Sequence, residues 1–433
     1  MKIKNAYKVV RFKNGLTLIL YRIKDIQSVY ISCAVKSGNY YIQDEADLGI
    51  AHFLEHLAFS YTEKFGKSEN LVKAVYEIGG YLNAVTDVLG TRFWIKVPFM
   101  SVKEAIDILY QLVFRSVIRE GDLEKERKII LNECRDNYAN PNWVFEKKIR
   151  ENRFKDLAPY YAPTTGNVEN ILSITKERIV NWKNKFLNPN NIIMSVVGNF
   201  AEDEVVGFIE KTFGNEKGGV AISFPRYDSD KYSDYLFYVQ PEKSNQIYFD
   251  INWPAFGWCE VKRHDEAVLA ILSHIIGRGP ISKLHLVLRE RLNIVYSCNS
   301  YRNIFPYLGM FGVYGSTSVE NLQLVFKTIR KILEEIILKG VKKADFVRII
   351  KYLDLSNYMS FETPESISDY LLYEMFDYGE IWDPEDYSEE RKKIKISEVG
   401  DMLKRILAPQ KLNVNFKGDI DNSLARKVAD ILR

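Results

Sequence analysis

The chain has 433 residues, which is too long for one ordinary hydrophobic core and predicts two domains of about 200 residues each. Hydrophobic residues make up 46% of the chain and charged residues 27%, which is typical of a globular protein. The 60 basic and 57 acidic side chains leave a net charge of +3, which argues against an extended basic surface and therefore against a nucleic-acid partner.

Apolar runs and cysteines indicate the compartment. No apolar run is long enough to span a bilayer, so we expect no membrane partner. The run Leu16–Leu20 includes Thr17 and is too short for the apolar region of a secretory signal. The four cysteines show no CxxC spacing and lie mostly among apolar residues, which is typical of reduced, packed thiols. These features predict a cytoplasmic protein.

The first half of the chain mixes strand and helix patterns. Strands are predicted at 9–12, 16–21, 29–35, 81–86, 91–97 and 191–197, with a turn at Asn14-Gly15. Helices are predicted at 47–59, 101–116, 122–138 and 175–186. We expect Asp122 to be the N-cap of the third helix.

The second half repeats this order. Strands are predicted at 236–239, 246–252, 295–302 and 309–316, and helices at 264–276, 281–291 and 318–339. Each half closes with a strand that ends nine residues after a proline, from Pro189 to Gly198 (198 − 189) and from Pro409 to Gly418 (418 − 409). The repeated order favours an internal duplication, and two unrelated domains that share an order are the alternative.

These elements predict an α+β fold of two homologous domains, each a mostly antiparallel sheet covered by helices. The domains would span residues 1–217 and 233–433. A turn-rich linker at 218–232, which contains Gly218, Gly219 and Pro225, would join them.

The segment Gly49–Leu57 carries two histidines on a predicted apolar helix. His52 and His56 are four residues apart and would lie on one face, which suits two ligands of a tetrahedral zinc ion. Glu55 leans toward the same side and could take a proton from a metal-activated water, in the order H-x-x-E-H. An isolated histidine pair of this spacing is often a partly buried surface pair. Burying three ionisable groups is costly, however, unless they are paired or bound to metal.

A catalytic zinc ion needs a third protein ligand. The predicted helix 122–138 carries Glu126 and Glu133, which are seven positions apart and therefore share one face. Ile129 and Ile130 beside them would turn that face toward the core. Acidic residues on a helix are usually solvated, so this pattern alone leaves the third ligand open.

Taken together, these residues resemble the insulinase/pitrilysin family of zinc peptidases. The matching features are the motif His52-x-x-Glu55-His56 and a later pair of glutamates, with 77 positions from His56 to Glu133 (133 − 56). The resemblance implies one zinc ion per chain, Glu133 as its third ligand and Glu126 as a carboxylate that supports the ligands. The length resembles the small-subunit members of the mitochondrial processing peptidase type, whose two domains form half of a clamshell.

The strand after the metal helix resembles the family's substrate strand. The resemblance implies an open edge there, to which a peptide adds as a further strand, with Asn83 and Ala84 as contact positions. By its residues alone this strand is an ordinary internal hairpin. Phe59 would shape an apolar pocket or belong to the core. Ser60-Tyr61 departs from the family, which often has a basic residue and glycine there.

The second half resembles the family's Arg–Tyr motif. Arg289 and Tyr296 are seven positions apart, as the motif requires, although their residues alone read as a helix end followed by a strand. The resemblance implies that Arg289 grips the substrate backbone and that Tyr296 donates to the oxyanion. The corresponding helix, 264–276, has no metal motif, so we expect one half to perform the chemistry and the other to help hold substrate.

We therefore expect a zinc endopeptidase that acts on short or unfolded peptides enclosed in a chamber. A non-catalytic partner subunit of a processing peptidase is one alternative, and a metal-storing or metal-sensing protein is another. The chain carries both the metal motif and the Arg–Tyr motif, which predicts a homodimer. A heterodimer with a relative that lacks the metal motif is the other possibility.

Overall fold

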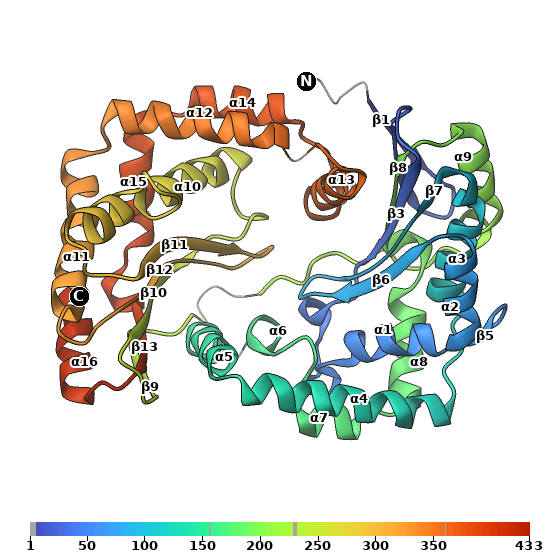
Figure 1. Ribbon diagram of the computed structural model, residues 1–433, viewed down its shortest axis with the longest axis horizontal. Coiled ribbons are helices and arrows are strands. Elements are labelled where there is room, and N and C mark those ends of the chain that lie inside the picture. Colours follow the sequence, from blue (N-terminus) through green and yellow to red (C-terminus); the bar gives the residue numbers. More distant parts are fainter. Residues whose placement is uncertain (1–5, 156, 228–231, 360) are drawn as a thin grey trace. The chain divides into compact units, whose positions relative to one another are not determined.

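The computed structural model describes residues 6–433 except 156, 228–231 and 360 (Figure 1). Contacts divide the chain into two compact units. Unit 1 comprises Met1–Trp143, Ala158–Pro225 and Asn357–Pro384, and unit 2 comprises Val144–Leu157, Arg226–Ser356 and Glu385–Arg433. Each unit thus includes a segment from the other half of the chain. Within the predicted linker 218–232, residues 228–231 lie outside the described residues.

Unit 1 is built on a six-stranded sheet with the order β1-β2-β8-β3-β7-β6. Neighbouring strands are antiparallel except β2 and β8, which are parallel. The strands are β1 (Tyr7–Arg11), β2 (Thr17–Arg22), β3 (Ser28–Val35), β6 (Tyr81–Thr86), β7 (Thr91–Pro98) and β8 (Ile192–Gly198). Apolar and β-branched residues fill β3 and β8, which are buried along almost their whole length because elements cover both faces.

Unit 2 is built on a five-stranded sheet with the order β11-β12-β10-β13-β9. Here the parallel pair is β13 and β9, and the other neighbours are antiparallel. The strands are β9 (Leu236–Pro241), β10 (Ile247–Ala255), β11 (Ser297–Ile304), β12 (Gly309–Thr317) and β13 (Asn413–Gly418).

The two sheets support the predicted duplication. The order β2-β8-β3-β7-β6 in unit 1 corresponds to β9-β13-β10-β12-β11 in unit 2, and the one parallel pair occupies the same place in each. Gly198 and Gly418 close the corresponding strands β8 and β13 with φ angles of 140° and 148°. A Cβ on Gly198 would lie 2.3 Å from the carbonyl oxygen of Ser28, so this strand end requires glycine.

Helices cover both faces of the first sheet. In unit 1 they are α1 (Ile50–Ser60), α2 (Ser68–Glu77), α3 (Val102–Phe114), α4 (Glu120–Ala139), α6 (Ala158–Tyr161), α7 (Val168–Ser173), α8 (Lys176–Phe186), α9 (Glu202–Lys211) and α13 (Pro364–Tyr378). Helices α1 and α3 pack on β7, whereas α13, orange in Figure 1, packs on β3 and β8. The core under α13 includes Ile19, Ala34, Ile193, Leu371 and Met375.

In unit 2 the helices surround a larger core that includes Phe249, Leu272 and Phe326. They are α5 (Pro141–Arg153), α10 (Arg263–Ile276), the π-helical turn η7 (His285–Arg291), α11 (Leu322–Lys339), α12 (Lys343–Met359), α14 (Pro384–Lys393), α15 (Ile396–Ile406) and α16 (Asn422–Ala429). The prediction of an α+β fold with two units of sheet and helices is confirmed.

Several predicted helix starts are wrong. Helix α11 begins at Leu322 instead of residue 318, because Ser318–Asn321 form a turn that is closed by the Asn321 N–H on the Ser318 carbonyl. The metal helix begins at Ile50 instead of residue 47, because Gly49 has a φ of 91° and interrupts the helical path. Helix α4 begins at Glu120, so Asp122 is not its N-cap. The Asp122 carboxylate instead accepts two hydrogen bonds from the guanidinium of Arg119, at 2.6 and 2.9 Å.

Over the described residues, no helix combines the length and apolar character that crossing a membrane would require.

Candidate metal centre

Helix α1 presents its polar residues to one side because the rest of its surface is buried. Ile50, Phe53, Leu54 and Leu57 are at most 3% exposed and anchor the helix in unit 1. The predicted residues His52, Glu55 and His56 are partly buried and occupy the remaining face. The two imidazole rings lie 4.6 Å apart, centroid to centroid.

Helix α4 packs on α1 and carries the two glutamates. Leu123, Ile130 and Cys134 are buried and fix the side of α4 that faces inward. Glu126 is buried as well, whereas the Glu133 side chain is 39% exposed. The two glutamates, two turns apart on α4, therefore differ in burial: the Glu126 carboxylate lies in the interior and the Glu133 carboxylate is partly exposed.

Two histidine nitrogens and the Glu133 carboxylate converge. His52 Nε2 lies 3.8 Å from Glu133 Oε2, and His56 Nε2 lies 3.7 Å from Glu133 Oε1. One ligand atom from each of these residues lies within 4.8 Å of the other two, and among the described residues this is the one group of three such side chains that could hold a metal ion. Ligands of a tetrahedral zinc ion, with bonds of about 2.0–2.2 Å, are separated by about 3.3–3.6 Å, so the donor set fits such an ion.

Glu126 contacts His56 at Nδ1, the ring nitrogen that does not face Glu133. Its Oε2 lies 3.3 Å from His56 Nδ1, and its Oε1 accepts a hydrogen bond of 3.1 Å from Ser60 Oγ. A carboxylate on Nδ1 fixes the imidazole so that Nε2 is the ligand atom. His56 thus has the arrangement expected of a metal-binding histidine.

Protonation differs between the two histidines. Burial lowers the pKa of His52 to about 4, with a further contribution from His56, so His52 is neutral at pH 7 as a ligand must be. Burial also lowers the pKa of His56. The hydrogen bond to Glu126 and the charge of Glu133 outweigh burial, and the pKa of His56 is raised overall. Its proton would compete with a metal ion.

Glu55 is held by a chain of buried hydroxyls. Thr86 Oγ1 donates to Glu55 Oε2 at 2.5 Å, and Thr86 Oγ1 and Thr91 Oγ1 are 3.2 Å apart. Ser37 Oγ donates to Thr91 Oγ1 at 3.1 Å. Burial raises the pKa of Glu55, the Thr86 hydrogen bond opposes this, and the pKa remains raised overall.

The sequence reasoning did not assign this hydroxyl chain. Thr86 lies in the predicted strand 81–86, but neither its residue type nor the family resemblance gives it a role. Thr86 lies next to Val85, and alternation along a strand puts neighbouring side chains on opposite faces. The alternation shows that Thr86 and Val85 face opposite sides of the sheet. It does not show which helix packs on the side of Thr86, so the hydrogen bond to Glu55 could be found only in the tertiary structure.

Strand β6 is the last strand of the first sheet, as predicted from the resemblance. At the end of the β6–β7 hairpin, the Asp87 N–H donates to the Gly90 carbonyl at 2.9 Å. Along an antiparallel strand, residues whose backbone bonds to the partner strand alternate with residues whose backbone points away from it. The N–H and C=O of Ala84, three residues before Asp87, therefore point to the free edge. Asn83 is exposed, and its Oδ1 accepts the Ala84 N–H at 2.9 Å. Phe59 is half-buried, with its ring 6.2 Å from that of Phe93.

Arg289 and Tyr296 lie in unit 2. Arg289 is exposed near the end of the π-helical turn η7, and Tyr296 is 61% exposed just before β11. Between them, Asn293 has a φ of 52°, the single non-glycine residue with positive φ in the described part of the chain. This left-handed residue turns the chain from η7 into the strand. Their predicted roles stay predictions.

Comparison with known proteins gives two family matches. A family model described as "Insulinase (Peptidase family M16)" matches residues 18–160, and one described as "Peptidase M16 inactive domain" matches residues 173–353. The first match contains the HxxEH motif, Glu126 and Glu133. The second contains most of the half that was predicted to lack a metal site.

Related proteins cover most of the chain. A protein of Rickettsia felis named "uncharacterized zinc protease" is 29% identical over 76% of this chain and 77% of its own. The mitochondrial-processing peptidase subunit beta of Saccharomyces cerevisiae is 23% identical over 89% and 85% of the two chains. The solved structure of a protease from Helicobacter pylori has a TM-score of 0.82 at 20% identity and covers 95% of this chain and 99% of that one. Sequence, site and fold agree, and the chain belongs to the insulinase family of peptidases, peptidase family M16.

Proposed function

We propose that this protein is an active zinc endopeptidase that hydrolyses short or unfolded peptides. The observation that carries the proposal is the convergence of His52, His56 and Glu133 beside Glu55. These residues fit zinc because two imidazoles, which bind metal in their neutral form, and one carboxylate are a known set of protein ligands for catalytic zinc. When bound, zinc supplies Lewis acidity that lowers the pKa of a water molecule toward neutrality.

Glu55 is the proposed general base. It accepts the proton of the attacking water and then delivers that proton to the leaving amine of the peptide. Thr86 holds one oxygen of the carboxylate, Oε2, which leaves Oε1 to accept the proton. Burial of Glu55 raises its pKa, and this makes the carboxylate a stronger base than a solvated glutamate.

The proposed substrate contact is addition of a peptide strand to the free edge of β6. An extended backbone can hydrogen-bond to the outward groups of Ala84, with Asn83 releasing the Ala84 N–H that it covers. Main-chain pairing demands an extended segment and little sequence. Substrates would accordingly be unfolded or short, and Phe59 would contact an apolar side chain.

The remaining roles rest on the family resemblance. We propose that Arg289 grips the substrate backbone and that Tyr296 donates to the oxyanion of the tetrahedral intermediate. In longer single-chain members the Arg–Tyr motif lies in the opposite half from the zinc, so a half-length chain would need a partner. A homodimer is the proposed assembly, and the cytoplasm is the proposed compartment.

Zinc content and peptide hydrolysis test the proposal together. Purified protein should hold one zinc ion per chain and cleave a quenched fluorescent peptide, and a chelator should abolish the cleavage until zinc is restored. Glu55→Gln should retain zinc and lose roughly 10²–10⁴ in rate. Zinc binding without cleavage by the wild-type chain would point instead to a non-catalytic subunit or a metal store.

A further inference from the structure

The end of helix α1 contacts the beginning of helix α4. The helix ends at Ser60, and its C-cap Tyr61 is extended, with φ and ψ of −157° and 133°. Ser60-Tyr61 is also the pair at which the sequence departs from the family, so the resemblance gives neither residue a role. Both side chains nevertheless contact α4 or its N-cap residue, Arg119. Because α1 and α4 carry all three candidate zinc ligands, these contacts bear on the geometry of the metal centre.

Ser60 contacts the buried carboxylate of Glu126. Both residues are 8% exposed, and Ser60 Oγ donates to Glu126 Oε1 at 3.1 Å. The other oxygen, Oε2, lies 3.3 Å from Nδ1 of His56, one turn earlier on α1. Among the described residues, these are the two side chains within hydrogen-bonding distance of the carboxylate. Glu126 is thus held through both oxygens across one turn of α1, which fixes the rotation of its carboxylate.

The Ser60 hydroxyl has one proton, and it also lies 3.4 Å from the carbonyl oxygen of His56. The carboxylate is the nearer acceptor and is charged, so the proton is directed to Glu126. Without this hydroxyl, Glu126 Oε1 would be buried with no hydrogen-bond donor, and the carboxylate would turn toward the ammonium of Lys125, now 4.0 Å away and largely exposed. That rotation would take Oε2 away from His56 Nδ1, so His56 would lose the contact that orients its imidazole.

Tyr61 contacts the first turn of α4 through Arg119. The guanidinium carbon of Arg119 lies 3.9 Å from the centroid of the Tyr61 ring, which is a cation–π contact. The same guanidinium donates two hydrogen bonds to the Asp122 carboxylate in the first turn of the helix. The backbone supports this contact, because the Val117 N–H donates to the Tyr61 carbonyl at 2.9 Å. The start of α4 is therefore attached to the residue that ends α1.

These contacts control the direction of α4. Arg119 and Glu126 are seven residues apart, and Glu133 lies a further seven residues on, about 10 Å along the helix axis in each step. A tilt of about 5° at Glu126 would move Glu133 by about 0.9 Å, whereas metal–ligand distances are held within about 0.2 Å. Arg127 also anchors α4, but its hydrogen bonds go to carbonyl groups of α7 and its C-cap and do not involve α1.

We propose that Ser60 and Tyr61 are positioning residues, which hold α4 at the angle that brings the Glu133 carboxylate to the two histidines. Ser60 acts through Glu126, and Tyr61 acts through Arg119. The inference rests on the proposed function in one respect, because it assumes that Glu133 and the two histidines bind zinc. It does not depend on peptide cleavage.

The test is zinc affinity, measured on stripped protein by competition with a chromophoric chelator. Ser60→Ala should bind zinc about tenfold more weakly, at the lower end of the loss that follows removal of residues behind metal ligands. Tyr61→Leu should weaken zinc binding by about two- to fivefold, the strength of an exposed cation–π contact. Tyr61→Phe keeps the ring and should bind zinc as the wild type does. Ser116→Ala is the matched control, because Ser116 is 6% exposed and its Oγ has no hydrogen-bond partner among the described residues.

A double-mutant cycle tests the route through Glu126. In a Glu126→Ala background the carboxylate is absent, so Ser60→Ala should cause no further loss of affinity, whereas Tyr61→Leu should keep its effect. Additive losses from Ser60→Ala and Glu126→Ala would overturn the role of Ser60. Wild-type affinity in Tyr61→Leu would overturn the role of Tyr61.

A rescue variant and a folding measurement complete the test. Ser60→Thr keeps a hydroxyl and should recover most of the affinity, and a loss as large as in Ser60→Ala would show that packing, and not the hydroxyl, matters. Alanine favours a helix, so Ser60→Ala should fold, and urea unfolding of the stripped proteins checks this. If the zinc-loaded wild type cleaves no peptide, the proposed function fails while the affinity cycle still decides the roles of Ser60 and Tyr61. A wild-type chain that binds no zinc would refute both.

Discussion

Thr86 Oγ1 donates a hydrogen bond of 2.5 Å to Glu55 Oε2, which links the edge strand β6 to the proposed general base. Thr86 is one residue from the hairpin loop, and its hydroxyl is in turn within 3.2 Å of Thr91 Oγ1. Glu55 has helical neighbours on one side and this strand on the other. The position of the carboxylate therefore depends on strand β6, where substrate is proposed to bind.

Thr86→Val should lower kcat because it keeps the shape of the residue and removes the hydrogen bond that orients Glu55. We expect a loss of about 10–100-fold, as for other residues that orient an active-site group, with zinc content unchanged. The Thr86 hydrogen bond lowers the pKa of Glu55, so its loss raises that pKa further. The base is then protonated up to a higher pH, and the acid limb of the rate profile moves upward.

Thr86→Ser is the control, since it restores a hydroxyl at the same place and should recover most of the rate. Steady-state kinetics from pH 5 to 8 on the three proteins, with zinc measured in each, separates the two effects. A Thr86→Val enzyme with wild-type kcat and an unmoved acid limb would contradict the orienting role.

Much of the candidate site can be predicted from the chain because it is local. His52, Glu55 and His56 share one helix, and their spacing determines which face they occupy. Glu133 required the family resemblance, since a partly exposed glutamate on α4 has no distinguishing pattern of its own. The predicted start of α1 differs from the structure by three residues, because Gly49 interrupts the helical path. The predicted start of α4 differs by two residues, because the Asp122 side chain pairs with Arg119 and does not cap the helix.

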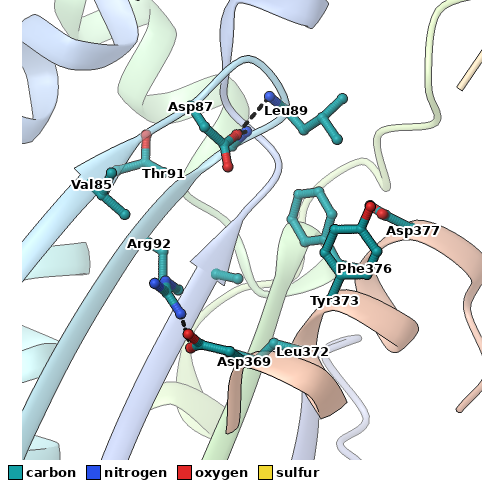
Figure 2. A pocket seen from close by; sticks show the side chains of 12 residues that line it. Val85, Asp87, Leu89, Thr91, Arg92, Asp369, Leu372, Tyr373, Phe376 and Asp377 are labelled. Atoms are coloured by element: carbon teal, nitrogen blue, oxygen red, sulfur yellow. Dashed lines mark hydrogen bonds and ion pairs between the residues drawn. The ribbon is translucent and has the colours of Figure 1, made fainter. Parts of the chain in front are cut away.

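The position of α13 could not be predicted for a different reason. Its buried residues Ile367, Leu371 and Met375 form an apolar stripe that either sheet could cover. Only the packing shows that this helix, from the second half of the chain, belongs to unit 1. A pocket of about 260 Å³ between the β6–β7 hairpin and α13 (Figure 2) depends on that helix and could therefore not be predicted from the sequence.

Zinc affinity should fall with decreasing pH because of His56. The pKa of His56 is raised, so its proton competes with zinc at and above the ordinary histidine range, whereas His52, with a pKa of about 4, competes only in stronger acid. Isothermal titration of zinc into stripped protein, in buffers of different ionisation enthalpy, should show about one proton released near pH 6.

Glu126→Gln tests the origin of that proton. The hydrogen bond to Glu126 raises the pKa of His56, so the variant should hold its histidine proton less tightly. At pH 8 zinc should bind about 10–100-fold more weakly, because the carboxylate behind His56 is lost. On acidification the affinity of the variant should begin to fall at a lower pH than that of the wild type. Parallel curves for the two proteins would show that His56 is not the competing group.

Gly166→Ala should destabilise unit 1. Gly166 has a φ of 74°, and an added Cβ would lie 2.6 Å from the carbonyl oxygen of Leu48, directly before the start of α1. Left-handed backbone and a steric clash together should lower the free energy of unfolding by about 2–4 kcal/mol, measured by urea denaturation. Gly121→Ala in α4 is the control, because its Cβ would meet no atom within 4 Å and alanine favours a helix. That variant should be as stable as the wild type or slightly more stable.

The proposed homodimer predicts that two inactive variants restore activity when they are mixed. Glu55→Gln lacks the base, and a double variant, Arg289→Ala with Tyr296→Ala, lacks the proposed substrate groups. If Arg289 and Tyr296 serve the metal centre of the partner chain, a mixed dimer contains one complete site, formed by intact Glu55 and the intact Arg–Tyr pair. Since closed two-fold pairing is the commonest assembly, random exchange should give about half mixed dimers and about a quarter of the wild-type rate. Subunit exchange, followed by size and by peptide cleavage, measures this. A fully active monomer, or mixed dimers that remain inactive after exchange, would show that the Arg–Tyr pair acts within its own chain or not at all.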